Sequence, residues 1–253
     1  MKAHSTAAAG ALGVATLAML ATFGALGACS SGGNHGAPGA ACNPCDPEGG
    51  ALATSGHDAN PYGVAYPSPP GGYGRKARSG NTPGSVMQNF KFLGYPNGDR
   101  SQGLQTIALA DYYDPCQKSY KLLHLTVAGV WCGPCNQETD AIVGAKSQLD
   151  SERVAVLQAL DDGKTQGVPA TTSDLDYWMN LHKVNFTEML DPGLTNLGGF
   201  FDAAAIPWNC DLDPRTMEII DESTGWAGDV STELQAGFNA LPAQPGYPVP
   251  ACN

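Results

Sequence analysis

The pentapeptide Trp131-Cys132-Gly133-Pro134-Cys135 constrains this chain more than any other feature of its sequence. It follows an apolar run, Leu122 to Val130, that predicts a buried strand, and it precedes a segment with apolar residues at helical spacing. Two cysteines at C-x-x-C spacing between a strand and a helix are typical of a reversible dithiol–disulfide pair. The motif therefore predicts thiol–disulfide exchange.

The predicted helix start gives the two cysteines different roles. The first turn of a helix presents unpaired backbone N–H groups and the positive end of the dipole, which stabilise a thiolate at Cys132. A thiol with a pKa of about 8.5 is roughly 3% ionised at pH 7, whereas a pKa near about 7 makes it half ionised. Cys132 is thus the predicted nucleophile. Cys135, one turn later and expected to be more buried, is the predicted resolving thiol. Pro134 is compatible with a first turn.

Two other interpretations of the cysteine pair are an inert disulfide staple and half of a zinc site. Zinc requires a second pair of ligands. Cys42 and Cys45 have the same internal spacing, but they lie much farther from Cys132 than the ~15–20 residues usual for a zinc ribbon. We expect redox activity, no metal, and no cofactor beyond the Cys132–Cys135 disulfide.

The N-terminal 28 residues predict an export signal. Lys2 precedes an apolar stretch from Ala7 to Leu26, and Leu26-Gly27-Ala28-Cys29 resembles a bacterial lipobox, whose cysteine is acylated and becomes the first mature residue. An uncleaved membrane anchor is the alternative. Either way, the globular part is expected outside the cytoplasm and attached to a membrane, with Cys29 as the predicted lipid site. Ser30 after it is compatible with the outer membrane of a bacterium, and the periplasm is the expected compartment.

Composition divides the rest of the chain. Residues 29–83 are rich in Gly and Pro and predict a flexible tether, in which Tyr62, Tyr66 and Tyr73 are expected to stay mobile. Residues 84–241 predict the folded domain and residues 242–253 an irregular tail. The formal net charge of −11 repels phosphate backbones, so no nucleic-acid partner is expected.

Hydrophobic periodicity predicts the elements of the domain. The predicted strands are 86–92, 106–110, 122–128, 154–160, 185–190, 206–212 and 217–221. The predicted helices are the segment after Cys135, 173–182 with Thr172 or Ser173 as N-cap, 194–200, and 229–241. This order favours an α/β fold, in which helices cover both faces of a sheet.

The order strand, Trp131 to Cys135, helix, strand, helix, Ile206-Pro207, hairpin, helix resembles the thioredoxin fold. The extra N-terminal strands and the export signal resemble its extracytoplasmic TlpA-like branch. The resemblance spans about residues 84–241 and is specific at Trp131 to Cys135 and at Ile206-Pro207. It implies an α/β thioredoxin-like fold, with a central mixed sheet flanked by helices and extra N-terminal strands.

The resemblance also implies supporting residues around the dithiol. They are Trp131, Gly133, Pro134, Glu138, Ile206 and Pro207. It implies a cis Ile206-Pro207 bond that leaves the preceding backbone open to a substrate strand. Thr126 stands where thioredoxin has a buried aspartate. Glu138 matches a glutamate common in the TlpA-like branch, and we expect it to pair with the helix dipole rather than to deprotonate Cys135. Asp140 replaces a proline that often kinks this helix, so a straighter helix is expected.

By the same resemblance, the chain is expected to be a membrane-tethered thiol–disulfide oxidoreductase that works as a reductase. Its expected partners are exported cysteine-containing proteins and a membrane electron donor. One alternative is a thiol peroxidase of peroxiredoxin type, but Gly129-Val130-Trp131-Cys132 lacks the threonine of a T-x-x-C site. Another alternative is a non-catalytic thioredoxin-like binding module.

The remaining cysteines and histidines give weaker signals. Cys210 is expected to be a buried thiol. Cys42, Cys45, Cys116 and Cys252 allow three disulfide connectivities, which the sequence does not separate. His124 is expected to be a packed core histidine, and His182 is expected near a helix end, where it suits the dipole.

Overall fold

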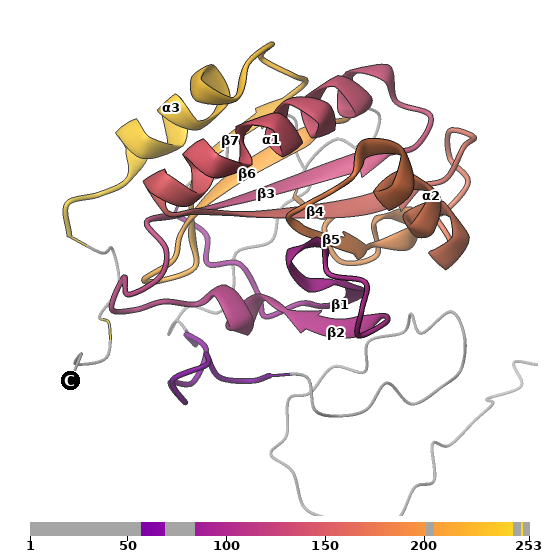
Figure 1. The fold of residues 1–253 in the computed structure, drawn as a ribbon. Coiled ribbons are helices and arrows are strands. Elements are labelled where there is room, and N and C mark those ends of the chain that lie inside the picture. The colour runs from indigo at the N-terminus through magenta and orange to yellow at the C-terminus, as the bar shows by residue number, and fades with distance from the viewer. Residues whose placement is uncertain (1–56, 69–83, 201–204, 245–248, 250–253) are drawn as a thin grey trace, which may run out of the picture. The chain divides into compact units, whose positions relative to one another are not determined.

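A seven-stranded mixed sheet, in the order β2-β1-β5-β4-β3-β6-β7, forms the centre of the protein (Figure 1). The structure, a computed structural model, describes residues 57–68, 84–200, 205–244 and 249, which belong to one unit, Pro44–Asn253. The strands are β1 (Lys91–Tyr95), β2 (Gln105–Ala108), β3 (Leu122–Gly129), β4 (Val154–Asp162), β5 (Thr187–Leu190), β6 (Trp208–Asp213) and β7 (Glu218–Thr224). The α-helices are α1 (Gly133–Glu152), α2 (Thr172–His182) and α3 (Val230–Ala240), and the short 3-10 helices are η1 (Pro96–Gly98), η2 (Leu109–Tyr112) and η3 (Pro192–Leu194).

The pairing of the strands identifies the fold. β3, β4 and β5 are parallel and are connected through α1 and α2, whereas β6 and β7 form an antiparallel hairpin beside β3, followed by α3. The Ile206–Pro207 peptide bond before β6 is cis. This is a thioredoxin-like fold, with β1 and β2 as antiparallel additions next to β5. The predicted fold class and the predicted cis bond are confirmed.

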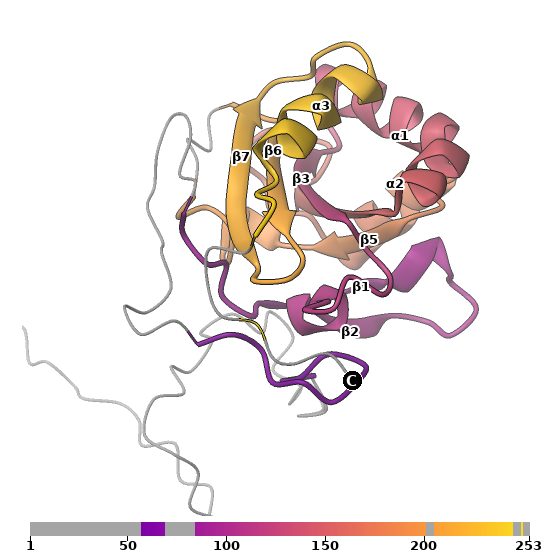
Figure 2. The same ribbon diagram turned by 90° about the vertical axis from the view of Figure 1, so that its left-hand side faces the viewer.

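The two faces of the sheet are covered differently (Figures 1 and 2). Ile142 of α1, Trp178 of α2 and Leu234 of α3 belong to one buried cluster, so all three described α-helices pack on the same face. The opposite face is covered by η2 and by irregular segments that contribute Met87 and Tyr66 to a second cluster. The expectation of helices on both faces is therefore met only in part. Among the described residues, no α-helix covers the second face, and the helix on it is the short 3-10 helix η2.

Three predictions depart most from the structure, and the bounds of the other predicted strands shift by up to three residues. Strand β1 begins at Lys91 rather than at residue 86, because Val86 forms only an isolated bridge, to Glu218. No α-helix forms over residues 194–200, where the Asp191 carboxylate accepts hydrogen bonds from the backbone N–H groups of Asn196 and Leu197 and holds a turn. The N-cap of α2 is Thr171, whose Oγ1 accepts from Asp174 N at 3.3 Å.

Part of the expected tether packs on the domain. Tyr66 is buried, its ring lies 5.8 Å from that of Tyr113, and its hydroxyl donates to the carbonyl oxygen of Met87 at 2.7 Å. The expectation that Tyr66 is mobile is therefore wrong, whereas Tyr62 is 54% exposed. Tyr73 lies outside the described residues.

The export signal, Cys29 and the tail from residue 250 onward also lie outside the described residues, so the predicted domain bounds stay predictions. Across the described ranges, no helix has both the length and the apolar character needed to cross a membrane.

Candidate dithiol active site

Cys132 and Cys135 lie at the junction of β3 and α1 and form a disulfide, with their Cα atoms 5.3 Å apart. Cys132 is the N-cap of α1, and its Sγ accepts a hydrogen bond from Cys135 N at 3.2 Å. Gly133 and Pro134, the first two residues of α1, are exposed. The strand–motif–helix arrangement expected from the sequence is therefore present, and the free end of the helix faces the sulfur of Cys132.

The two cysteines do not differ in burial as expected. Cys132 is 1% exposed and Cys135 is 0% exposed. Partly buried Trp131 and Ile206 pack against the cluster that contains both cysteines, which explains the burial of the first one. What distinguishes the two cysteines is the helix cap: only the Cys132 sulfur accepts from the first turn of α1.

The cis-proline loop lies against the dithiol. Cys132 Sγ is 3.6 Å from the carbonyl oxygen of Ile206, and the carbonyl oxygen of Pro207 accepts from Gly225 N at 2.8 Å. Gly129 permits this approach, because a Cβ atom there would lie 3.0 Å from Trp131 Nε1 and 3.1 Å from Ile206 Cδ1. The structure thus brings together the two segments that carried the resemblance.

Trp131 is fixed by an acid that the sequence analysis missed. Its Nε1 donates to Asp162 Oδ2 at 3.0 Å, and the same oxygen accepts from Gly167 N at 2.6 Å. The neighbouring Asp161 is buried, and burial together with the charge of Asp162 raises its pKa to about 7. The signal in the sequence was the acidic pair at the end of β4. Because β3 and β4 are parallel, this end of β4 lies beside the end of β3, where the motif begins.

Glu138 is fully buried, which contradicts the expectation of a dipole-pairing surface acid. It lies one turn after Cys135 on the inward face of α1. Its Oε2 accepts from Thr126 Oγ1 at 3.1 Å and its Oε1 accepts from Asn209 Nδ2 at 2.8 Å. Burial raises its pKa to about 7, although His124 and Asn209 act in the opposite direction. The buried acid absent from position 126 is thus supplied by the helix above it.

A buried ion pair lies in the same layer. His124 is buried as expected for a core histidine, and its Nδ1 lies 2.8 Å from Asp211 Oδ1. Burial disfavours the charged ring, but the hydrogen bond and the charge of Asp211 outweigh this effect and raise the pKa of His124. Asp211 was missed, because an acid inside a strand gives no indication in the sequence of its partner on a neighbouring strand.

A second histidine was placed correctly, but its partners were missed. His182 ends α2, and its ring nitrogens lie 2.7 Å from Asp140 Oδ1 and 3.1 Å from Asn136 Oδ1. Both partners come from α1, which runs without interruption from Gly133 to Glu152 as expected for a helix without the kinking proline. The signal was the polar pair at i, i+4 on one face of that helix.

The other cysteines form no second site among the described residues. Cys210 is buried in β6 as a thiol, as expected. Cys116 is disulfide-bonded, whereas Cys42, Cys45 and Cys252 lie outside the described residues. In the part of the chain that the structure describes, no group of three or more His, Cys, Asp or Glu residues is placed to hold a metal.

No protein-family model matches the sequence, and no curated protein matches it. Solved structures do. One, described as a thiol:disulfide interchange protein DsbE from Chlorobium tepidum, is 20% identical with a TM-score of 0.48, over 64% of this chain and 99% of the other. A DsbF homologue from Corynebacterium diphtheriae is 17% identical with a TM-score of 0.44, over 70% and 98%. A secreted thiol-disulfide isomerase from Corynebacterium glutamicum is 17% identical with a TM-score of 0.44, over 70% and 96%.

Proposed function

We propose that this chain is a thiol–disulfide oxidoreductase whose reacting groups are Cys132 and Cys135. One observation carries the proposal: the sulfur of Cys132 caps α1, 3.2 Å from Cys135 N, and lies 3.6 Å from the carbonyl oxygen that precedes a cis-proline. The cap favours the thiolate of Cys132 in the reduced protein. The carbonyl oxygen of Ile206 offers a main-chain acceptor to a substrate strand beside that thiolate.

The reaction transfers two electrons to a substrate disulfide. The Cys132 thiolate attacks one substrate sulfur, so a mixed disulfide forms and the other substrate sulfur leaves as a thiolate. Cys135 then loses its proton and attacks the Cys132 sulfur. This step forms the Cys132–Cys135 disulfide and releases the second substrate thiolate, so the substrate is reduced and the protein is oxidised. No cofactor takes part in either step.

Glu138 is the proposed acceptor for the proton of Cys135. It is buried one turn from Cys135, and its pKa of about 7 allows it to take and return a proton near neutral pH. Thr126 and Asn209 each donate to one of its oxygens and so stabilise the carboxylate once the proton has left.

We expect the protein to act as a reductase outside the cytoplasm, tethered through a lipid on Cys29. The support is the apolar stretch that ends in Leu26-Gly27-Ala28-Cys29. Reduction in an oxidising compartment requires two electrons from a membrane donor, and the substrates would be exported proteins with cysteines. Labelling with a radioactive fatty acid tests the anchor: the wild-type chain should incorporate label, and Cys29→Ala should not.

Trapping of mixed disulfides tests the proposed function. Cys135→Ser leaves the nucleophile without its resolving thiol, so we expect this variant to accumulate a covalent complex with a model peptide disulfide. Cys132→Ser should form no complex and should lose turnover at least a thousandfold, because it lacks the attacking thiolate. Cys210→Ala, which removes the buried thiol of β6, is the matched control and should turn over like the wild type.

Equal turnover by Cys132→Ser and the wild type would refute the proposal. Turnover of hydrogen peroxide in place of the peptide disulfide would favour a thiol peroxidase.

A further inference from the structure

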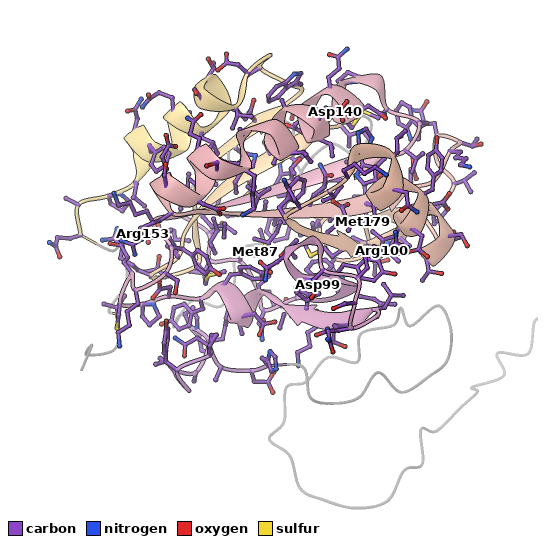
Figure 3. The ribbon with its side chains drawn as sticks, viewed as in Figure 1. Met87, Asp99, Arg100, Asp140, Arg153 and Met179 are labelled. Atoms are coloured by element: carbon purple, nitrogen blue, oxygen red, sulfur yellow. A yellow bond between two sulfur atoms is a disulfide. The ribbon has the colours of Figure 1, made fainter. Side chains whose placement is uncertain are left out.

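A buried histidine links the surface of α1 to the dithiol loop. The side chain of His182 is 4% exposed, whereas that of Asp140, its partner at Nδ1, is 67% exposed. Figure 3 shows Asp140 on the part of α1 that lies beside α2. Asn136, the partner at Nε2, lies one turn earlier on α1. The two helices therefore hold the imidazole ring between two side chains of α1.

The dithiol loop fixes the orientation of the Asn136 amide. Its Nδ2 donates to the carbonyl oxygens of Cys132 at 2.7 Å and Val130 at 3.4 Å. The reversed amide would bring two acceptor oxygens to 2.7 Å, so Oδ1 must be the atom that faces His182. The backbone N–H of Asn136 donates to the same Cys132 carbonyl at 3.1 Å. Asn136 thus holds the backbone on both sides of Trp131.

These contacts require His182 to donate from both ring nitrogens. Asp140 Oδ1 and Asn136 Oδ1 can only accept, and a neutral imidazole carries a single N–H. The imidazolium form satisfies both contacts. The ring lies at the C-terminal end of α2 and packs 4.2 Å from the Trp178 ring centroid. Asp140 is the charged group in contact with the ring, and Lys183 follows it in the chain.

We propose that protonated His182 is a positioning residue for the Cys132 nucleophile. The imidazolium holds Asn136 Oδ1, Asn136 Nδ2 holds the Cys132 carbonyl, and this keeps the Cys132 sulfur in line with Cys135 N. Loss of the ring proton removes one of the two donors and loosens this chain of contacts. The inference rests on the proposed thiol–disulfide exchange, because it gives His182 a role in forming the Cys132 thiolate that attacks the substrate.

The test is the pH profile of alkylation of Cys132 by iodoacetamide in the reduced full chain, followed by mass spectrometry. His182→Leu should lower the alkylation rate at pH 7 by about three- to tenfold and shift the profile to higher pH, because the thiolate is less well stabilised. His182→Gln can still donate to Asn136 and should restore part of the rate. Asp150→Asn, an exposed acid on the same helix, is the control and should behave like the wild type.

Asp140→Asn separates hydrogen bonding from charge. Its amide can donate to Nδ1, so a neutral His182 keeps its Nε2–H for Asn136, and this variant should retain the rate at pH 7. A wild-type profile in folded His182→Leu would overturn the inference. If His182→Leu does not fold, Asn136→Ser takes its place, since serine does not reach both contacts. A wild-type alkylation profile in this variant would overturn the inference. Alkylation needs no turnover, so a chain that fails to exchange disulfides would refute the proposed function and leave this test readable.

Discussion

Glu138 shows how the surroundings of one residue set its chemistry. Its carboxyl is enclosed between α1 and the sheet and accepts hydrogen bonds from two neutral donors, Thr126 and Asn209. Burial penalises the charged form, and this is why its pKa in the folded protein is about 7 against a usual 4.5. The same residue on the outer face of α1 would be a permanently charged surface acid. The inward face is therefore what makes it suited to exchange a proton near neutral pH.

This shifted pKa predicts how stability depends on pH. Because the folded-state pKa of Glu138 lies above the unfolded one, its favourable contribution is complete below about pH 4.5 and is lost as the pH rises through about 7. Wild-type stability should fall relative to Glu138→Gln between pH 4.5 and 8, by on the order of 3 kcal/mol at about 1.4 kcal/mol per pKa unit. Urea unfolding at both pH values measures this. Asp150→Asn should show no such difference, and parallel curves for Glu138→Gln and wild type would contradict the buried acid.

At the residue scale, the sequence predicted the position of the dithiol loop better than the contacts around it. The two cysteines, the cis-proline segment and Trp131 were found because each belongs to a local pattern. Asp162, Asp211 and the burial of Glu138 were missed, because each depends on which strand faces which helix. An acid near the start of a helix looks the same in the sequence whether it points to water or to the core.

At the scale of elements, α3 is held to the sheet by a close approach at Gly237. This glycine is buried, and a Cβ atom there would overlap the carboxylate of Asp211, the partner of His124. Gly144 is the opposite case: it is exposed on α1, and a Cβ atom there meets nothing within 4 Å. The two helices thus provide a matched pair of glycines: one where a side chain would clash and one where a side chain has room.

Substitution by alanine should separate these glycines. Gly237→Ala must displace Asp211 and should lower the free energy of unfolding by about 1–3 kcal/mol. Gly144→Ala relieves the entropic cost of glycine in a helix and should raise it by about 0.5–1 kcal/mol. Thermal and denaturant unfolding of both variants measures the effects. A stabilised Gly237→Ala would show that α3 does not approach β6 this closely.

The elements themselves were largely predictable. β3, β4, α1 and α3 have long apolar patterns and were found within a few residues, since burial of one face imposes its period on the sequence. The helix expected at 194–200 does not form, because the Asp191 carboxylate accepts hydrogen bonds from two backbone N–H groups and holds a turn there. Such side-chain capping has no periodic signal in the sequence. The predicted start of the first strand was wrong, because residues 86–90 alternate like a strand but lie mainly against β7 and the turn before it.

At the scale of the molecule, a segment outside the predicted domain completes the core. Tyr66 enters the cluster on the face of the sheet opposite the α-helices. Its neighbourhood in the sequence is rich in glycine and proline, so composition favoured a tether, and only the pairing with Met87 and Tyr113 shows otherwise.

Two tyrosines of this segment provide the corresponding test. Tyr66→Ala should lower the free energy of unfolding by about 3 kcal/mol, because it leaves a cavity and an unpaired carbonyl at Met87. Tyr62→Ala, at a side chain that is 54% exposed, should change it by less than about 0.5 kcal/mol. Equal effects of the two substitutions on chemical unfolding would mean that the segment does not belong to the folded core.

The measurement that tests the central claim most directly is the equilibrium reduction potential of Cys132 and Cys135 in the full chain. The chain is equilibrated against a dithiothreitol or glutathione series, and alkylation with mass spectrometry reports these two cysteines separately from Cys116. We expect a reversible two-electron transition near about −270 mV, the value of a reducing dithiol. A transition near about −120 mV would contradict the reductase direction, and a pair that does not exchange at all would contradict the proposed enzyme.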